Sequence, residues 1–178
     1  LACQKLAKDY EGSDVVLEPL PSFTVLKDLI VDLTPFFDRV KLLRPYLLPA
    51  LAAPAAERTQ SQQDQKKLDE VIRCILCACC TAACPVVLEN PDYLGPAPLV
   101  WAFRYVFDSR DDRSLERLKQ LDYPNGVWAC VNYFECTRVC PKSIPVTRCI
   151  NTLKREIEKR LPPPVPDSAG YYRGRRKP

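Results

Sequence analysis

Apolar positions recur at helical spacing in the second half of the chain. Leu99, Phe103 and Val106 lie three or four residues apart, as positions on one face of a helix do. A longer stripe of the same kind follows nearer the C-terminus and comprises Val146, Cys149, Ile150, Leu153 and Ile157. The pattern predicts two helices, with Cys149 packed in the core rather than binding metal.

The first half of the chain predicts one further helix and leaves one segment undecided. Thr34-Pro35 is a favourable helix start, because threonine caps a first turn well and proline is tolerated within it. The apolar face that follows comprises Phe36, Phe37, Val40 and either Leu43 or Leu47. The apolar run from Val25 to Leu33 fits a strand and a helix equally well. Residues 49–65 are polar and rich in proline and alanine, which predicts an exposed connector.

The composition narrows the class of protein. Of 178 residues, 47% are apolar and 27% charged, which is typical of a globular chain rather than a disordered one. A net charge of +4 is too balanced to indicate nucleic acid as a partner. No apolar run approaches the roughly 18–20 residues that span a bilayer, and no targeting peptide is recognisable. The absence of histidine removes the usual imidazole base and most catalytic zinc sites.

Eight of the ten cysteines gather in two short segments; Cys3 and Cys149 lie outside them. Five lie between Cys74 and Cys84, and three lie between Cys130 and Cys140. Disulfide frameworks distribute cysteines over loops, whereas metal sites collect them on tight turns. Clustered thiols with aliphatic neighbours therefore indicate a soft-metal site in a reducing compartment.

The first segment is Cys74-Ile-Leu-Cys77-Ala-Cys-Cys80-Thr-Ala-Ala-Cys84-Pro85. This spacing matches the bacterial ferredoxin run, in which three thiolates hold one iron–sulfur cluster and the fourth cysteine belongs to the other cluster. Cys79 is out of that register, so it is not expected to be a ligand. Zinc is the alternative metal for the same thiols.

The second segment repeats this frame but has a tyrosine at the second cysteine position. It is Cys130-Val-Asn-Tyr133-Phe-Glu-Cys136-Thr-Arg-Val-Cys140-Pro141. If the last cysteine of each segment binds the cluster of the other segment, one complete 4Fe–4S ligand shell results. It consists of Cys74, Cys77, Cys80 and Cys140. The other shell has only three thiolates, from Cys84, Cys130 and Cys136. It predicts a 3Fe–4S cluster with Tyr133 filling the vacant corner; a corner held by water, or a site without a cluster, remains open.

At these motifs the chain resembles the iron–sulfur subunit of succinate dehydrogenase and its fumarate reductase relatives. The resemblance extends over roughly residues 1–160 and includes the segments Glu18–Pro21, Val25–Asp32, Lys67–Asp69, Asn90–Ala97, Phe103–Arg104, Asp108–Asp111 and Cys140–Lys142. It implies a mainly α fold, with a helical two-cluster, bacterial ferredoxin-like domain over residues 34–160. A short remnant of a β-rich plant-type ferredoxin domain would precede it at 1–33, and a Pro-rich basic tail would follow at 161–178.

The resemblance implies an electron-transfer subunit of a membrane-bound succinate:quinone oxidoreductase, with no succinate site on this chain. A FAD-containing flavoprotein partner would oxidise succinate. Electrons would pass through 2Fe–2S, 4Fe–4S and 3Fe–4S centres to quinone, at a pocket formed with membrane-anchor subunits. The implied location is peripheral, on the matrix side of the mitochondrial inner membrane or the cytoplasmic side of a bacterial plasma membrane.

Cys3 corresponds to the last ligand of the family's 2Fe–2S cluster, which lies in a Leu-Ala-Cys sequence. The other three ligands would lie outside this chain, either because the sequence is incomplete or because a separate gene encodes the N-terminal half. A terminal thiol without metal is the alternative for Cys3.

The expected quinone pocket departs from the family pattern. Family members commonly place an aromatic residue shortly after the first Cys-Pro, whereas Glu89 stands about there in this chain, and Val131 stands where many have histidine. Pro85, Val86 and Glu89 are therefore carried over only as the location of a quinone-pocket loop. Protons for quinone would come from tyrosine, carboxylates such as Glu89, water or another chain.

Two other functions remain open. One is an iron–sulfur relay subunit of another quinone-linked or fumarate-reducing complex; relatives that use other donors or acceptors usually keep complete four-cysteine motifs, so Tyr133 disfavours them. The other is a non-redox, zinc-stabilised interaction module. The type of metal distinguishes them.

Overall fold

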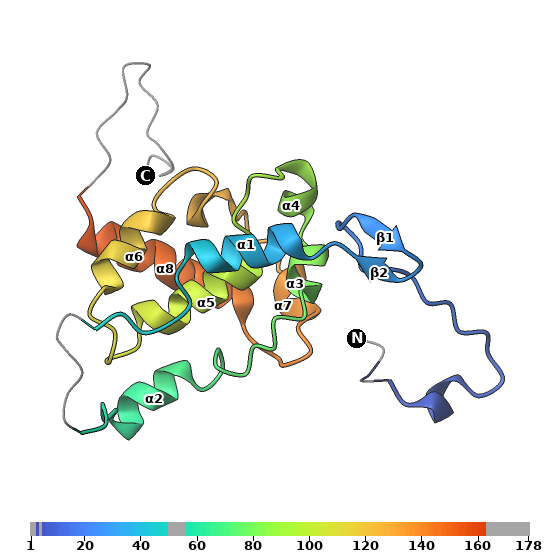
Figure 1. Cartoon of the computed structure of the whole chain (residues 1–178), viewed down its shortest axis with the longest axis horizontal. Coiled ribbons are helices and arrows are strands. Elements are labelled where there is room, and N and C mark those ends of the chain that lie inside the picture. Colours follow the sequence, from blue (N-terminus) through green and yellow to red (C-terminus); the bar gives the residue numbers. More distant parts are fainter. Residues whose placement is uncertain (1–2, 4, 50–55, 163–178) are drawn as a thin grey trace, which may run out of the picture.

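The computed structural model describes residues 3, 5–49 and 56–162, and their regular structure is mainly helical (Figure 1). The elements in chain order are the 3₁₀ helix η2 (Ala7–Tyr10), β1 (Val25–Lys27), β2 (Ile30–Val31), α1 (Thr34–Leu42), α2 (Gln62–Leu68), α3 (Cys79–Ala82), α4 (Pro85–Glu89), α5 (Pro96–Val106), α6 (Ser114–Leu121), the 3₁₀ helix η3 (Val127–Ala129), α7 (Glu135–Arg138) and α8 (Val146–Arg160). The expected predominance of helix is confirmed. Among the described residues, no helix combines the length and the apolar composition needed to cross a bilayer.

The core is built on α5 and α8, which pack against each other, with α6 against both and α1 across α5 (Figure 1). The apolar stripe predicted near the C-terminus forms the inner face of α8, and each of its five side chains is at most 3% exposed. Leu99 and Val106 of α5 are also buried, while Phe103 is partly buried against the same core. Helical periodicity therefore located both helices correctly.

The start of α5 depends on backbone geometry as well as on periodicity. Gly95 has φ +95°, a conformation that a side chain would strain, and Pro96 then occupies the first turn, where its missing amide hydrogen is not needed. This turn brings the beginning of α5 close to the cysteine segments, so it matters for the site described below.

Helix α1 begins at Thr34-Pro35 as predicted, but the predicted capping role of Thr34 is wrong: Thr34 is the first helical residue, and its side chain does not cap the first turn. The residue preceding the helix is Leu33, and the backbone amide of Thr34 donates a hydrogen bond to Asp32 Oδ1 at 2.8 Å. The buried face consists of Phe36, Val40 and Leu43. Phe37, which was expected on that face, is 38% exposed because it lies one position, or about 100°, further round the helix than Phe36.

The undecided run Val25–Leu33 forms a hairpin rather than a helix or a single strand. β1 and β2 pair antiparallel, with Val25 opposite Val31, and Asp28 turns the chain with φ +51°. The strand side chains are exposed or half-buried, and the hairpin projects from the helical body in Figure 1. It therefore adds little to the core of the described residues.

The expected connector 49–65 is shorter than predicted. Helix α2 already begins at Gln62, because the Ser61 hydroxyl accepts a hydrogen bond from the Asp64 amide at 3.1 Å and caps the first turn. Residues 50–55 of the connector lie outside the described residues. So does most of the predicted basic tail, from residue 163 onward.

Candidate metal centres

The two cysteine segments have the same backbone shape. In the first, Leu76 and Ala78 adopt positive φ angles of 53° and 60°. In the second, Asn132 and Phe134 do so at the corresponding positions, both with φ 65°. Positive φ is uncommon for residues other than glycine. Its recurrence at matching positions shows that one strained loop is built twice, each copy leading into a short helix, α3 or α7.

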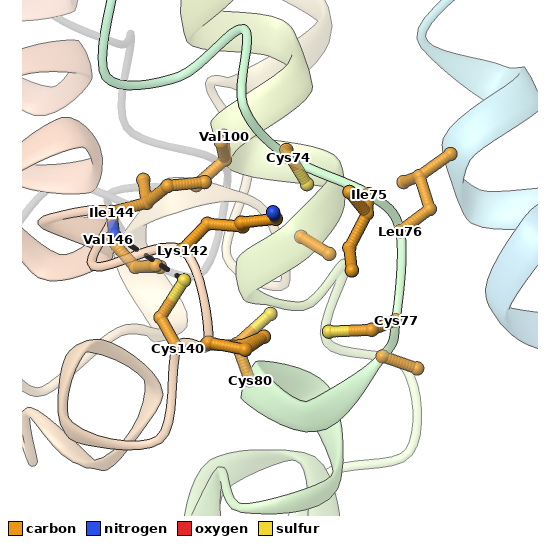
Figure 2. A pocket seen from close by; sticks show the side chains of 13 residues that line it. Cys74, Ile75, Leu76, Cys77, Cys80, Val100, Cys140, Lys142, Ile144 and Val146 are labelled. Carbon is orange, nitrogen blue, oxygen red and sulfur yellow. Dashed lines mark hydrogen bonds between the residues drawn. The ribbon is translucent and has the colours of Figure 1, made fainter. Parts of the chain in front are cut away.

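Four of the predicted ligand thiols line one cavity, which has about 380 Å³ of empty volume and is partly open to solvent. They are Cys74, Cys77, Cys80 and Cys140. Figure 2 shows the four sulfurs on different sides of this space, with Cys140 brought in from the second segment. The other lining side chains are mostly aliphatic, and Lys142 supplies the one formal charge among them. We call this the first cavity.

The other three predicted thiols line a neighbouring second cavity, with about 290 Å³ of empty volume. They are Cys84, Cys130 and Cys136. Tyr133 also lines it and lies between Asn132 and Phe134, where the first loop has Cys77 between Leu76 and Ala78. The side of the second cavity that would need a fourth thiol therefore carries a tyrosine, which is 52% exposed.

The two cavities are adjacent, because single helices contribute to both. In α5, Pro96 lines the second cavity and Ala97 lines the first. In α8, Thr147 lines the second cavity and Val146 lines the first. The start of each helix thus forms part of the wall between two groups of thiols.

Hydrogen bonds to two of the thiols come from the α8 end of the site. The Ile144 amide donates to Cys140 Sγ at 3.4 Å, and the Cys136 sulfur lies 3.4 Å from the Thr147 hydroxyl. Thr147 is 1% exposed and also receives support from Thr137, whose hydroxyl is 3.1 Å away. Sequence reasoning missed Thr147; a polar residue next to the first apolar position of the α8 stripe was the available signal.

Burial raises the pKa of four thiols in the two cavities, namely Cys74, Cys80, Cys84 and Cys136. The thiols are therefore protonated at neutral pH without metal, and metal binding must release their protons. Soft sulfur donors with apolar neighbours are the donor set of iron–sulfur clusters, so the residues fit such a group. Within the described part of the chain, no three His, Cys, Asp or Glu side chains converge on the position of a single metal ion.

The remaining cysteines lie apart from the two cavities. Cys79 begins α3 and lines neither; burial and then the neighbouring Cys77 raise its pKa to about 11. Cys149 is 3% exposed in the α8 core, and burial raises its pKa to about 12. Cys3 is exposed. All ten cysteines are described, and none forms a disulfide.

The expected quinone-pocket segment is a short helix, α4, rather than a loop. Proline at the first turn, directly after Cys84, favours that helix. Pro85 and Val86 line the second cavity, whereas Glu89 is exposed at the far end of α4 and is not among its lining residues.

Tyr93 is a second residue of the site that sequence reasoning missed. Its side chain is fully buried and lines the second cavity. Burial, and then the nearby thiols, hold the pKa of Tyr93 well above its usual range, so the hydroxyl keeps its proton. Its position within the segment Asn90–Ala97, one of those that resembled the family, was the only signal in the sequence.

Two family models match the chain and define its class. Residues 70–144 match a 4Fe-4S dicluster domain, and residues 1–38 match a 2Fe-2S iron-sulfur cluster binding domain. The part of the chain that forms the two cavities thus matches an iron–sulfur dicluster domain, and both cavities lie almost entirely within this match.

Curated relatives then define the family. The chain is 42% identical over 158 residues to the succinate dehydrogenase iron-sulfur subunit of Coxiella burnetii, an alignment that covers 88% of this chain and 67% of the relative. It is 40% identical over 162 residues to the subunit of that name from Paracoccus denitrificans, covering 90% and 62%. The chain belongs to the succinate dehydrogenase iron–sulfur subunit family, and it spans about two thirds of the length of these relatives.

A solved structure supports the fold. A chain of the Mycobacterium smegmatis Sdh1 complex in the apo form superposes with a TM-score of 0.70 at 24% identity. The match covers 83% of this chain and 63% of that chain. At this identity the likeness concerns the fold alone.

Proposed function

We propose that this chain is the electron-transfer part of a succinate:quinone oxidoreductase. The observation that carries the proposal is the pair of adjacent thiol-lined cavities, each assembled from both cysteine segments. When bound, iron–sulfur clusters take up and pass on single electrons. Adjacent centres within one small domain suit an electron relay.

The first cavity would hold the 4Fe–4S cluster through Cys74, Cys77, Cys80 and Cys140. Four thiolates complete a cubane's ligand shell, and the four lining sulfurs are what supports this assignment. Lys142 also lines this cavity and supplies a positive charge beside the proposed ligands.

The second cavity would hold the 3Fe–4S cluster through Cys84, Cys130 and Cys136. Only three thiols line it, and Tyr133 occupies the loop position of the missing one. The tyrosine ring would cover the corner where a fourth iron would need a ligand. The Thr147 hydroxyl, beside Cys136, would stabilise that thiolate.

The described fold and the family matches also support a division of the chain. Residues 1–33 would be the end of a 2Fe–2S ferredoxin domain, with Cys3 as one cluster ligand and the others outside this chain. Residues 34–160 would form the two-cluster domain, and residues 161–178 a basic tail. The supports are the match of residues 1–38 to a 2Fe-2S domain and the exposure of the β1–β2 hairpin, which leaves its side chains free to pack elsewhere.

The quinone end would lie at the second cavity, near α4. Pro85, Val86 and Phe134 line that cavity, and Phe134 is 58% exposed; Leu88, two positions beyond Val86 in α4, is 64% exposed. Such exposed apolar surface suits a membrane-anchor subunit as its cover. The chain would then bind peripherally, between a flavoprotein and the anchor, at the matrix or cytoplasmic face of the membrane.

Metal analysis and EPR spectroscopy of the native complex test the proposal. We expect iron and sulfide, a near-isotropic signal from the oxidised protein and loss of that signal on adding succinate. The Cys136→Ala variant should lose this signal while keeping the spectrum of a reduced 4Fe–4S centre. Zinc in place of iron would overturn the relay and favour a zinc-stabilised module.

A further inference from the structure

Tyr93 carries a buried hydroxyl that makes no hydrogen bond of normal geometry within the described residues; the Cys130 thiol is its one polar side-chain neighbour close enough to act on it as a hydrogen-bond partner. The side chain is 0% exposed, so water does not reach it either. An unpaired buried hydroxyl is costly, and such groups in native proteins usually hydrogen-bond to a bound water, ion or cofactor. The partner of Tyr93 is therefore to be sought in the space that its hydroxyl faces.

That space is the second cavity. Tyr93 lines it. The three thiols of this cavity are the ionisable groups that affect the pKa of Tyr93, and Cys130 has the largest effect among them. Tyr133 lines the same cavity but is half exposed to solvent. Of these two tyrosines, Tyr93 is the one whose hydroxyl is closed off from solvent, so a group bound in the second cavity can be its partner.

The backbone on both sides of Tyr93 is fixed. The Tyr93 amide donates to the Asn90 carbonyl at 3.0 Å, and the Leu94 amide donates to the Asn125 carbonyl at 2.8 Å. The Asn90 and Asn125 side chains are joined at 3.0 Å. Because the turn is held at both ends and the ring is buried, the phenol oxygen keeps its place and only its hydrogen can turn.

We propose that the Tyr93 hydroxyl donates a hydrogen bond to a sulfur of the cluster held by Cys84, Cys130 and Cys136, and so raises its reduction potential. This inference rests on the function proposed above. Reduction adds one electron to the cluster and makes its sulfurs more negative, so a donor stabilises the reduced form more than the oxidised form. The proton stays on the tyrosine oxygen in both states. By raising this potential, Tyr93 would favour electron transfer to the cluster in the second cavity.

The Tyr93→Phe variant tests this inference because it removes the hydroxyl and keeps the ring. In a redox titration of the native complex followed by EPR, we expect the reduction equilibrium constant of the three-iron centre to fall about tenfold, or about 59 mV for a one-electron couple. Tyr105→Phe is the matched control. The Tyr105 hydroxyl is also held inside the protein, where it donates to the Pro45 carbonyl at 2.7 Å, but Tyr105 lines neither cavity, so the potential should not change.

The outcomes separate this inference from the function. A Tyr93→Phe complex with a normal three-iron signal and an unchanged potential would overturn the hydrogen bond and leave the relay intact. Zinc in the unaltered complex would remove the relay itself. Should Tyr93→Phe fail to assemble, 4-aminophenylalanine at position 93 keeps the shape and a weaker donor, and an intermediate potential is expected.

A measurement on the unaltered complex completes the test. After brief transfer to D₂O, side-chain hydroxyls exchange before amides in hydrogen-bonded helices do. Pulsed EPR should then detect a deuteron coupled to the three-iron centre at hydrogen-bond distance from a cluster sulfur. Absence of that coupling would contradict the proposal even if no variant assembles.

Discussion

Tyr133 is the residue that we propose sets the type of the second centre. It occupies the loop position that Cys77 occupies in the first segment, between two residues of positive φ. The two loops have the same backbone, so the difference between the cavities lies in the side chain at this position. In both loops the backbone conformation is the one that presents Cys77 in the first segment.

The Tyr133→Cys variant should therefore convert the three-iron centre into a four-iron one. A fourth thiolate adds the missing ligand and negative charge, which lowers the reduction potential and slows electron transfer to quinone. EPR of the oxidised protein should lose its near-isotropic signal. Tyr133→Phe, which adds no ligand, should keep the signal; an unchanged spectrum in Tyr133→Cys would show that this corner is assigned wrongly.

Cys77 and Cys79 form a natural pair for testing ligand roles, since they are two residues apart and only Cys77 lines a cavity. Cys77→Ala should lose the 4Fe–4S spectrum and iron with it, because three thiolates do not complete that shell. Cys79→Ala should retain full iron and sulfide content. Equal losses in the two variants would contradict the assignment.

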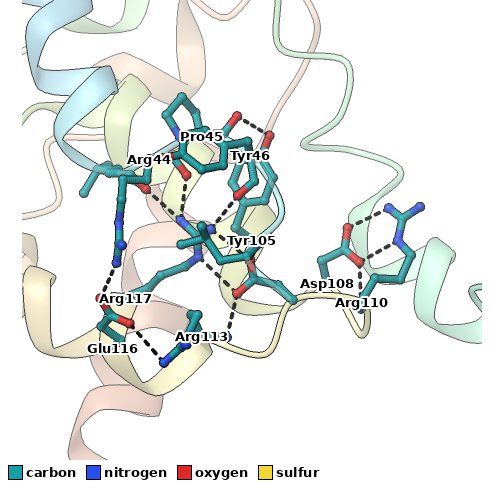
Figure 3. A network of polar contacts seen from close by, with 12 residues as sticks. Arg44, Pro45, Tyr46, Tyr105, Asp108, Arg110, Arg113, Glu116 and Arg117 are labelled. Atoms are coloured by element: carbon teal, nitrogen blue, oxygen red, sulfur yellow. Dashed lines mark hydrogen bonds and ion pairs between the residues drawn. The ribbon is translucent and has the colours of Figure 1, made fainter. Parts of the chain in front are cut away.

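At the scale of elements, Arg117 of α6 forms a buried ion pair with Asp111 in the turn before α6, and its hydrogen bonds tie this pair to the chain that follows α1 (Figure 3). The Arg117 side chain is 2% exposed, and its Nη2 lies 2.8 Å from Asp111 Oδ2. The same guanidinium donates to the carbonyls of Leu43, Arg44 and Tyr46 at 2.7–2.9 Å. Every one of these acceptors belongs to the chain leaving α1, so one side chain fixes where α1 ends.

Removing one partner of such a pair leaves a buried charge unpaired, which is strongly destabilising. Arg117→Ala should lower the stability of the α1–α6 contact by about 3–5 kcal/mol, measured by native-state hydrogen exchange of the α6 amides. Arg113→Ala is the control: its side chain is about half exposed and pairs with Glu116 at 3.9 Å, so a cost of about 0–1 kcal/mol is expected. Similar costs in both would mean that the buried pair contributes no more than a surface one.

The nearby pair of Asp108 and Arg110 shows how an arginine also lowers the pKa of a buried carboxyl group. Burial alone would raise the pKa of Asp108, but hydrogen bonds from Arg110, at 2.7 and 2.8 Å, outweigh it and the pKa is lowered. Asp108 thus stays ionised at neutral pH and closes the turn after α5.

At the scale of the whole molecule, the two cavities lie within the packing that joins α3, α5, α7 and α8. Metal binding by deprotonated thiols contributes to folding free energy, because a chain without the clusters has empty space and strained loops there. The clusters are therefore expected to be structural as well as redox groups.

Removal of the clusters with a chelator should loosen the loops 74–80 and 130–136 first. Their amide protection should fall at least about tenfold, or about 1.4 kcal/mol of local stability, as measured by hydrogen exchange with mass spectrometry. Helix α6 lines neither cavity and should keep most of its protection. Uniform loosening of the whole chain, or no change at the loops, would contradict this picture.

The sequence by itself determined the features that depend on local spacing. The stripe of α8 follows from a 3.6-residue period, and the partition of seven thiols into sets of four and three follows from the spacing of short loops; each set lines one cavity. The sequence pattern left two local features undecided, the hairpin at 25–31 and the outward side of Phe37, and the tertiary structure decided what depends on distant partners: the approach of Tyr93 and Thr147 to the thiols. Short apolar runs fit several local conformations, and a buried hydroxyl gains its meaning only from the group it faces, so neither could be known before the chain was packed.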